Sequence, residues 1–368
     1  MAMRAGFGRL LTVLNEPPEI GRQRWFWLGF FVVVAGLLSA PRWLSPYDLL
    51  NVSYILTTVF LAFGLCLIWG FGGILSLGQA AFLGVGGYAY GVVGINLIED
   101  QGNTDLALLT GLLVPAALAA VLGYIMFYAR LKGVYVAIMM LVVTLLFETF
   151  LNQTAGPQWY IGKAHLGGNN GLGRFSADIH EPPSLLLGFG ESTLEFGGAT
   201  REFFYFTVGL GIVAYLGLRL LVNSRLGRIL VAIREEPDRT EAFGYDVRLI
   251  QTAVFCLGAM LAGLSGILYV SWGNFITPAA FGVTNNILPV IWVAVGGRKS
   301  LTATAISTVA LVWLSQLLAI QGEYAFIVLG GLLIVVMLAM PDGVITSTVQ
   351  ILADWRRRRG LRADREAA

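Results

Sequence analysis

The sequence is short of charge: only 12% of its 368 residues are Asp, Glu, Lys or Arg, whereas 57% are hydrophobic. Soluble domains usually carry roughly 25% charged residues, which keep their surface compatible with water. A chain with about half that share exposes much of its surface to lipid. The composition therefore excludes an ordinary soluble domain and indicates an integral membrane protein.

Reactive side chains are equally scarce. The two cysteines, Cys66 and Cys256, lie in apolar runs and form no CxxC pair, so we expect neither a disulfide framework nor a metal site. The two histidines, His165 and His180, share one polar loop, which leaves little for acid–base chemistry. No HExxH or GxSxG segment is present. We therefore expect a protein that is not an enzyme and holds no metal.

The sequence also lacks the usual means of powering transport. It has no GxxxxGK[ST] phosphate-binding segment, because the nearest candidate, at 296–300, lacks the leading glycine. Ion-coupled carriers usually need ionisable groups at membrane depth, and among the apolar runs only Glu148 is a plausible embedded carboxylate. Energy for transport would therefore come from another protein, and we expect no cofactor in this chain.

Long apolar runs are what the chain does have. A membrane-crossing helix needs about 20 mostly apolar residues, and the candidate runs lie near 25–41, 49–69, 76–97, 106–128, 134–152, 203–222, 250–271, 283–297, 301–320 and 324–340. The first run is interpreted as a retained span, because Pro41 follows the candidate cleavage site and Trp25 and Trp27 suit an interfacial anchor. The expected fold is all-α: a polytopic transmembrane helix bundle of about ten spans.

Basic residues test this topology independently, because Lys and Arg are retained on the cytoplasmic side of a membrane. With the N-terminus inside and the spans alternating, 20 of the 24 Lys and Arg residues fall inside. We therefore expect both termini in the cytoplasm, with a cytoplasmic segment 1–24, a transmembrane domain 25–340 and a basic tail 341–368. Two long loops interrupt the bundle, an outer one at 153–202 and an inner one at 223–249.

The inner loop has an apolar face. Its hydrophobic side chains recur at i, i+3, i+4 and i+7, the spacing of one helix face: Leu226, Ile229, Leu230 and Ile233. Pro237 ends this helix. A basic loop kept only for topology needs no such stripe, so we favour a short amphipathic helix that sits in a partner's groove. A solvated basic loop is the alternative.

Polar residues interrupt small-residue segments at membrane depth. The glycines of the stretch 70–87 are expected mainly to let helices approach closely. Polar groups in a membrane are costly unless they pair or face a cavity. That cost marks five candidates for a translocation path: Ser76, Gln79, Asn274, Asn285 and Asn286. AAFLGV at 80–85 is similar to AAFGV at 279–283, which an inverted repeat on opposite sides of the membrane would explain; chance is the rival explanation.

The outer loop contains GGNNGL at 167–172. Consecutive glycines and asparagines permit positive φ and a tight turn that exposes backbone amides. Such a turn could form part of an outer mouth, with four candidate residues: Gly167, Gly168, Asn169 and Asn170. A plain turn without such a role is the alternative.

Several motifs follow one another between about 48 and 345: LSLGQ at 75–79, KGVY at 132–135, GGNNGL at 167–172, SRLGR at 224–228, AIRE at 232–235 and AGLSGILY at 262–269. Together they resemble the permease subunits of ABC importers for branched-chain amino acids and urea. Three further segments are similar to the urea-type second permease: FLNQ at 150–153, FGYD at 243–246 and VIWVAVGGR at 290–298.

This resemblance implies the ABC importer permease fold, in a bacterial inner membrane, and import of urea or a related small amide. It implies a sister permease, two cytoplasmic ATPase subunits that use the ATP, and a periplasmic substrate-binding protein. The inner loop would then be the coupling loop that docks on an ATPase, with these residues: Arg225, Arg228, Leu230, Ile233, Arg234, Glu235, Glu236 and Gly244. Branched-chain amino acid import is the alternative. A stand-alone carrier and an intramembrane enzyme are alternatives of other classes, which the scarcity of embedded ionisable residues disfavours.

Overall fold

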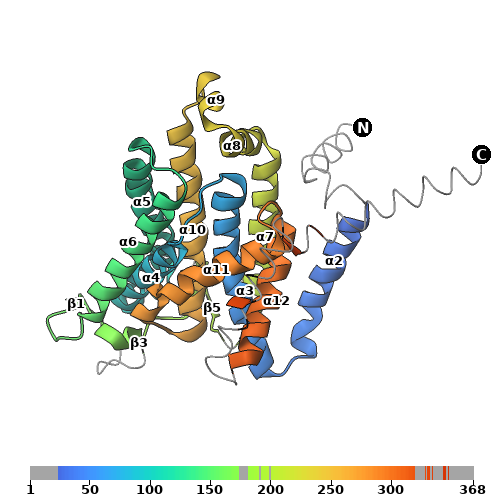
Figure 1. The fold of residues 1–368 in the computed structure, drawn as a ribbon. Coiled ribbons are helices and arrows are strands. Elements are labelled where there is room, and N and C mark those ends of the chain that lie inside the picture. Colours follow the sequence, from blue (N-terminus) through green and yellow to red (C-terminus); the bar gives the residue numbers. More distant parts are fainter. Residues whose placement is uncertain are drawn as a thin grey trace, which may run out of the picture.

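The protein is described by a computed structural model that covers residues 24–173, 181–189, 192–198, 200–319 and the isolated positions 328, 330–331, 334, 343–344 and 347. Within these residues it is a bundle of helices with short strands at one end (Figure 1). In chain order the α-helices are α2 (Arg24–Ser39), α3 (Pro46–Leu65), α4 (Gln79–Gln101), α5 (Asp105–Tyr128), α6 (Val134–Asn152), α7 (Arg201–Asn223), α8 (Arg225–Glu235), α9 (Pro237–Ala242), α10 (Val247–Gly273), α11 (Val283–Gly296) and α12 (Leu301–Ala319).

Shorter elements join these helices. Three are short 3-10 helices, η1 (Ala40–Arg42), η3 (Gly168–Asn170) and η4 (Pro278–Phe281), and one is a π-helix, η2 (Cys66–Phe71). The strands are β1 (Tyr160–Ile161), β2 (Ala164–His165), β3 (Leu172–Gly173), β4 (Leu185–Phe189), β5 (Ser192–Phe196) and β6 (Phe275–Ile276).

Seven helical segments among the described residues are long and apolar enough to cross a membrane: Pro46–Phe71, Gln79–Gln101, Asp105–Tyr128, Val134–Asn152, Arg201–Asn223, Val247–Gly273 and Leu301–Leu318. Two shorter apolar helical segments, Trp27–Arg42 and Val283–Gly296, lie at the expected first and eighth spans. The expected tenth span, 324–340, lies almost entirely outside the described residues. The all-α fold is confirmed, whereas the number of spans stays a prediction.

Helix α10 forms the centre of the bundle and packs against α3, α4 and α5. Membrane helices gain little from a hydrophobic effect between them, so close packing of small residues has to hold them together. A Cβ added to Gly86 on α4 would lie 2.5 Å from the Cα of Gly263 on α10. Phe255 of α10 packs edge-to-face against Phe82 and Phe127, with ring centroids 5.3 and 5.8 Å away. The packing role expected for the glycines of 70–87 is confirmed at this crossing.

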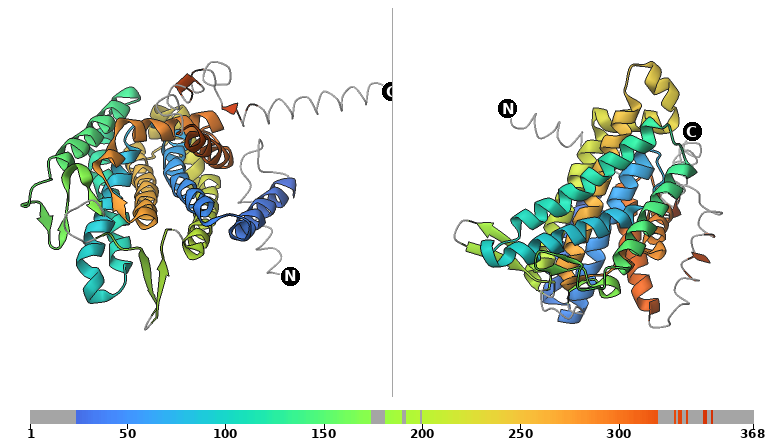
Figure 2. Two further views of the ribbon diagram at one scale, coloured as in Figure 1. Left: turned by 90° about the horizontal axis from the view of Figure 1, so that it is seen from below. Right: turned by 90° about the vertical axis from the view of Figure 1, so that its left-hand side faces the viewer.

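The two ends of the bundle differ in structure (Figure 1). Helices α8 and α9 form one end, which we call the α8–α9 end, and the six short strands lie at the other, the strand end. The strands pair antiparallel as β1–β2, β3–β6 and β4–β5. Figure 2 shows the β4–β5 hairpin projecting from the side of the bundle. The outer loop 153–202 is thus partly built from strands, which its glycine- and proline-rich composition did not indicate.

Helix α2 lies at the edge of the bundle and contacts α7. The contact centres on Arg219, which is fully buried although its charge placed it with the basic loop residues in the sequence. Its guanidinium donates to the hydroxyl of Tyr215 at 2.9 Å and lies 5.5 Å from the centroid of the Trp27 ring. The hydroxyl of Tyr215 also bonds with that of Thr302 at 2.7 Å. Arg219 therefore joins α2, α7 and α12 rather than serving as a loop charge.

Candidate functional site

A break in the helices lies inside the bundle. Helix α3 continues into the π-helix η2, the chain then runs without helix through 72–78, and α4 begins at Gln79. π-helical turns are rare and are frequent at functional sites. Ser76 and Gln79 are both buried. The amides of the first turn of α4 therefore need partners from the protein itself.

Asn286 of α11 supplies one of these partners. The backbone amide of Ala80 donates to its side-chain oxygen at 3.3 Å. The side-chain amide of Asn286 in turn donates to the carbonyls of Phe281 and Gly282, each at 3.1 Å. The hydroxyl of Ser76 accepts a bond from the amide of Gly78 at 3.3 Å. The start of α4 is thus tied to the start of α11 by one buried asparagine.

Gln79 is the unusual member of this group. Its side chain is 1% exposed, and neither its oxygen nor its nitrogen has a hydrogen-bond partner among the described residues. Leaving a buried polar group unpaired costs about 1–3 kcal/mol for each group. A side chain kept at that cost is a good candidate for a role other than packing.

The other two path candidates lie apart from Ser76, Gln79 and Asn286. Asn285 is exposed and donates to the carbonyl of Ala279 at 2.8 Å. Asn274 ends α10 with a left-handed backbone, φ 54°, and donates to the carbonyl of Pro182 at 3.0 Å at the strand end. The structure therefore brings three of the five candidates together at the break.

The two similar segments at 80–85 and 279–283 contact each other. The first begins α4, whereas the second forms η4 and the start of α11. A Cβ on Gly84 would collide with the ring of Phe281. The two segments differ in conformation although they meet at one site, and their origin as an inverted repeat stays a prediction.

Helix α8 confirms the predicted amphipathic helix but corrects what its apolar stripe contacts. Its start is capped by Ser224, whose hydroxyl accepts from the amide of Leu226 at 3.1 Å. Leu230 and Ile233 are 1% and 2% exposed, because they pack against this chain's own helices. They are therefore not available to a partner. Aspartate at either position would bury an unpaired charge and disturb the fold itself.

The predicted stripe is divided, because Leu226 is 54% exposed and Ile229 lies on the open side of α8 and α9. This open side lines a shallow groove together with the loop after α9: Arg225, Arg228, Ile229, Ala232, Glu235, Glu236, Arg239, Thr240, Phe243 and Tyr245. Phe243 is 83% exposed, which is unusual for a phenylalanine outside lipid. Docking of α8 and α9 on a partner stays a prediction, and this groove is more accessible for it than Leu230 and Ile233. Gly244 follows it with a left-handed backbone, φ 89°.

Arg234 links α8 to the break. Its guanidinium donates to the carbonyl of Gly70 in η2 at 2.5 Å and to the carboxylate of Glu235 at 2.7 and 3.0 Å. The hydrogen bonds and the charge that Arg234 brings to Glu235 lower the pKa of that carboxyl below its usual range. A Cβ on Gly73, where φ is +73°, would lie 2.7 Å from the Cγ of Arg234. The backbone of Gly70 also lies against the carbonyl of Arg298, so α8, η2 and the α11–α12 turn meet here.

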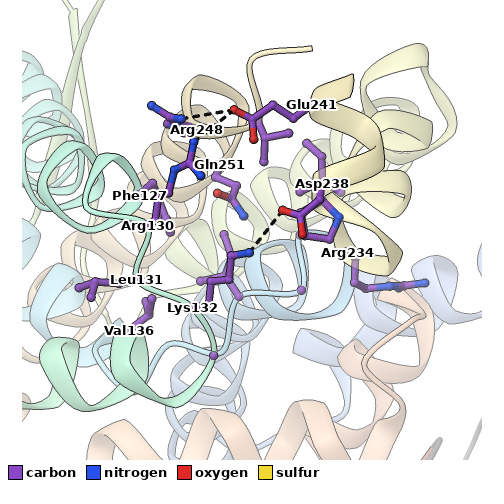
Figure 3. Close-up of a pocket in the computed structure, with 17 residues that line it drawn as sticks. Phe127, Arg130, Leu131, Lys132, Val136, Arg234, Asp238, Glu241, Arg248 and Gln251 are labelled. Atoms are coloured by element: carbon purple, nitrogen blue, oxygen red, sulfur yellow. Dashed lines mark hydrogen bonds and ion pairs between the residues drawn. The ribbon is translucent and has the colours of Figure 1, made fainter. Parts of the chain in front are cut away.

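A pocket of about 170 Å³ opens beside this link, between α9, α10 and the α5–α6 turn (Figure 3). Six charged residues line it: Arg130, Lys132, Arg234, Asp238, Glu241 and Arg248. Six apolar residues line it too: Ile74, Phe127, Leu131, Val136, Ile233 and Val247. Arg234 was among the sequence candidates. The other five charged residues were not, because they come from the α5–α6 turn, α9 and the start of α10, which share no common spacing.

The charges around this pocket are paired across its mouth (Figure 3). Lys132 lies 3.5 Å from Asp238, while Arg130 and Arg248 lie 3.9 and 3.3 Å from the same oxygen of Glu241. Arg234 points away from these pairs, toward Glu235 and η2. The pairs connect α9 to the α5–α6 turn and to the start of α10.

The GGNNGL segment is a structured turn at the strand end. Gly167, Gly168 and Gly171 have φ of 71°, 54° and 70°, as the tight turn required. Asn169 and Asn170 are exposed. A Cβ on Gly171 would collide with the carbonyl of Ile276, against which the turn packs. The turn is confirmed, and its part in an outer mouth stays a prediction.

A bundle of membrane-length helices, with a helix pair at one end linked to a break inside the bundle, is the architecture of a polytopic α-helical membrane protein and suits a permease. The sequence profile of the family described as "Branched-chain amino acid transport system / permease component" matches residues 47–337, and the chain belongs to this family. The expected resemblance is confirmed at the level of the family.

The individual relatives are permeases as well. The chain is 28% identical over 347 residues to the high-affinity branched-chain amino acid transport system permease protein LivM of Salmonella typhimurium, covering 89% of this chain and 76% of that protein. It is 26% identical to LivM of Escherichia coli, with the same coverage. A probable LivM of Methanocaldococcus jannaschii is 25% identical over 158 residues, 39% of this chain and 46% of that protein. No solved structure gives a significant match.

These names bear on the substrate. The relatives are named for branched-chain amino acid transport, and nothing supports the urea-type specificity expected from the sequence. The alternative, branched-chain amino acid transport, fits the comparisons better.

Proposed function

We propose that this chain is the transmembrane permease subunit of an ATP-driven ABC importer that moves branched-chain amino acids into the cytoplasm. The family and the names of the relatives support the substrate class. The observation that carries the coupled mechanism is the bond from Arg234 of α8 to the carbonyl of Gly70, because it joins the exposed helix pair to the break.

The energy and the substrate come from partners. The excess of basic residues in the inner segments supports an α8–α9 end that faces the cytoplasm of a bacterial inner membrane. Two ATPase subunits hydrolyse the ATP there, and one docks in the groove around Phe243. A sister permease completes the path, and a periplasmic binding protein delivers substrate at the strand end. The turn at 167–170 forms part of that outer mouth.

Closure of the ATPases moves α8 and α9 as one unit. Because Arg234 holds Gly70, this movement pulls on η2 and on the non-helical segment 72–78. That segment leads into α4, whose first turn is bonded to Asn286. The starts of α4 and α11 therefore move together, and Gln79 lies at the point that changes. Its unpaired amide is the group we propose to contact the passing substrate.

Uptake by the complete transporter in proteoliposomes tests this function. We expect ATP-dependent, binding-protein-dependent uptake of labelled leucine that excess valine reduces and excess urea does not. Urea uptake without leucine uptake would overturn the proposal that the substrate is a branched-chain amino acid. Leucine uptake by this chain without ATPase subunits would overturn the coupled mechanism in favour of a stand-alone carrier.

A further inference from the structure

The pocket of Figure 3 has no role in the proposed transport path, so its lining residues are open to another function. We propose that it binds one aliphatic amino acid from the cytoplasm, and that the bound molecule holds the helix pair α8–α9 still and slows import. The identity of the ligand rests on the proposed function. The pocket thereby makes the permease sensitive to the amount of its own product.

The two kinds of lining residue suit the two parts of such a ligand. The floor of the pocket is apolar. It is formed by side chains that are otherwise buried in the protein: Ile74, Phe127, Val136, Ile233 and Val247. The rim carries both signs of charge. An aliphatic side chain fits such a floor, while its ammonium and carboxylate groups meet the rim. A neutral amide such as urea would use neither feature.

The rim has a place for one more carboxylate. Arg130 and Arg248 share a single oxygen of Glu241 at 3.9 and 3.3 Å, so two guanidinium groups face one carboxylate. Guanidinium groups bind carboxylates best with two parallel hydrogen bonds, and this sharing leaves much of that capacity unused. A ligand carboxylate between the two arginines would complete it.

The rim has a place for an ammonium group too. Asp238 and Glu241 are three residues apart on α9, which puts them on one face of that helix. The present partner of Asp238, Lys132 of the α5–α6 turn, lies 3.5 Å away and is exposed. Exposed ion pairs contribute only about 0–1 kcal/mol, so a ligand ammonium can replace this one.

The α5–α6 turn holds its charges at the pocket by an unusual backbone. Arg130 has φ 57°, and Asn274 is the only other described residue besides glycine with positive φ. Residues held in this region cost about 1–3 kcal/mol and cluster at ligand clamps. Figure 3 shows the side chain of Arg130 directed at Glu241 and Arg248.

The position of the pocket gives the ligand its effect. Gly72 and Gly73, where the break begins, line the pocket together with Asp238 and Glu241 of α9. A molecule bound between α9 and the α5–α6 turn adds contacts to both, so it favours the arrangement in which they are close. Movement of α8–α9 relative to the break then becomes harder.

A lipid headgroup fits the pocket less well. The volume of the pocket, about 170 Å³, is below the roughly 300–1,000 Å³ of pockets for drug-sized ligands. The apolar floor is closed by core residues and gives acyl chains no continuation. We therefore commit to a small molecule, and lipid binding is an outcome of the test below.

The test uses the complete transporter in phosphatidylcholine proteoliposomes, with the α8–α9 end facing a lumen that contains ATP. Unlabelled leucine is loaded into the lumen, and the initial uptake of labelled leucine is measured. We expect luminal leucine to slow uptake about fivefold or more, the lower range of typical allosteric coupling. Luminal urea, 4-methylpentanoate and isopentylamine, which lack one or both charges of the amino acid, should not slow it.

Two pocket variants and one control complete the design. Asp238→Asn removes the carboxylate that the ligand ammonium would meet, and Arg130→Asn removes a guanidinium but keeps a residue that tolerates positive φ. Both should import leucine but lose most of the inhibition by luminal leucine. Lys299→Gln, an exposed charge on the α11–α12 turn, should be inhibited like the native chain.

The outcomes separate this proposal from the transport function. Normal uptake without inhibition by luminal leucine overturns the pocket proposal and leaves the function intact. Equal inhibition of the native chain and both variants also overturns it. If the variants change uptake only in liposomes with anionic lipid, the pocket takes a headgroup. If no leucine is imported, equilibrium binding of labelled leucine to the solubilised complex, reduced by Asp238→Asn, decides on the pocket alone.

Discussion

The two ends of the bundle are held together by different interactions. The α8–α9 end depends on side chains: the pairs Lys132–Asp238 and Arg248–Glu241 and the bond from Arg234 to Gly70. The strand end depends on the backbone: three antiparallel strand pairs and a glycine turn. Exposed charge pairs exchange partners at little cost, whereas paired strands that are closely packed do not. One end is therefore suited to move and the other to stay fixed.

The largest effect is expected at the strand end, from Gly171→Ala. Alanine would need φ 70° with ψ −164°, a conformation found essentially only for glycine, which costs about 1–3 kcal/mol, and its Cβ would collide with the carbonyl of Ile276. Unfolding of the solubilised permease should therefore shift strongly toward lower temperature. Gly102→Ala has a similar φ, +65°, but its Cβ would contact nothing, so it should cost only the backbone part. Equal shifts for both would show that the turn is not closely packed.

The next effect concerns the break between the two ends. Gln79→Met keeps the length of the side chain and removes the unpaired amide, so the free energy of unfolding should rise by about 1–3 kcal/mol. Leucine uptake should fall at the same time. Gln101→Met on the exposed end of the same helix should change neither. A destabilised Gln79→Met protein would show that the amide has a structural partner.

At the α8–α9 end, Arg234→Met should uncouple leucine uptake from ATP hydrolysis without unfolding the permease. The bonds to Gly70 and Glu235 are lost, so ATP hydrolysis should continue while leucine uptake falls about tenfold, the equivalent of about 1.4 kcal/mol. Arg234→Lys keeps the charge but cannot bond on two sides, and should be intermediate. Normal uptake by Arg234→Met would show that this residue does not couple α8 to the break.

The smallest effect on stability is expected from Lys132→Gln. The pair with Asp238 is 3.5 Å long and exposed, so its loss should lower the free energy of unfolding by less than about 1 kcal/mol. Chemical unfolding of the solubilised permease measures this. A loss as large as that of Gly171→Ala would mean that charges fix the α8–α9 end as firmly as strands fix the other.

The sequence predicts the features that depend on one helix at a time. Apolar runs locate the helices, and the spacing from Leu226 to Ile233 predicts α8, found at Arg225–Glu235. The cost of polar groups in a membrane indicates Ser76, Gln79 and Asn286, which the structure brings together. Each of these inferences uses only local spacing and the chemistry of lipid.

The features that the sequence could not predict depend on which segments meet. A stripe such as Leu230 and Ile233 has the same spacing whether its own chain or a partner covers it. Leu172 pairs with Ile276 although they are far apart in the chain, and no periodicity links such short strands. The charged rim likewise combines the α5–α6 turn with α9 and α10. The substrate is the same kind of problem, because motifs shared across a transporter family report the machinery more than the cargo.

Distance measurement by double electron–electron resonance tests the central claim most directly. In a chain without Cys66 and Cys256, one pair of spin labels replaces Asp238 on α9 and Tyr135 on α6, and a second pair replaces Ile161 and Leu194 at the strand end. Between the nucleotide-free and the ATP–vanadate states of the complete transporter, the first distance should change and the second should not. A fixed first distance together with a changing second one would contradict the account.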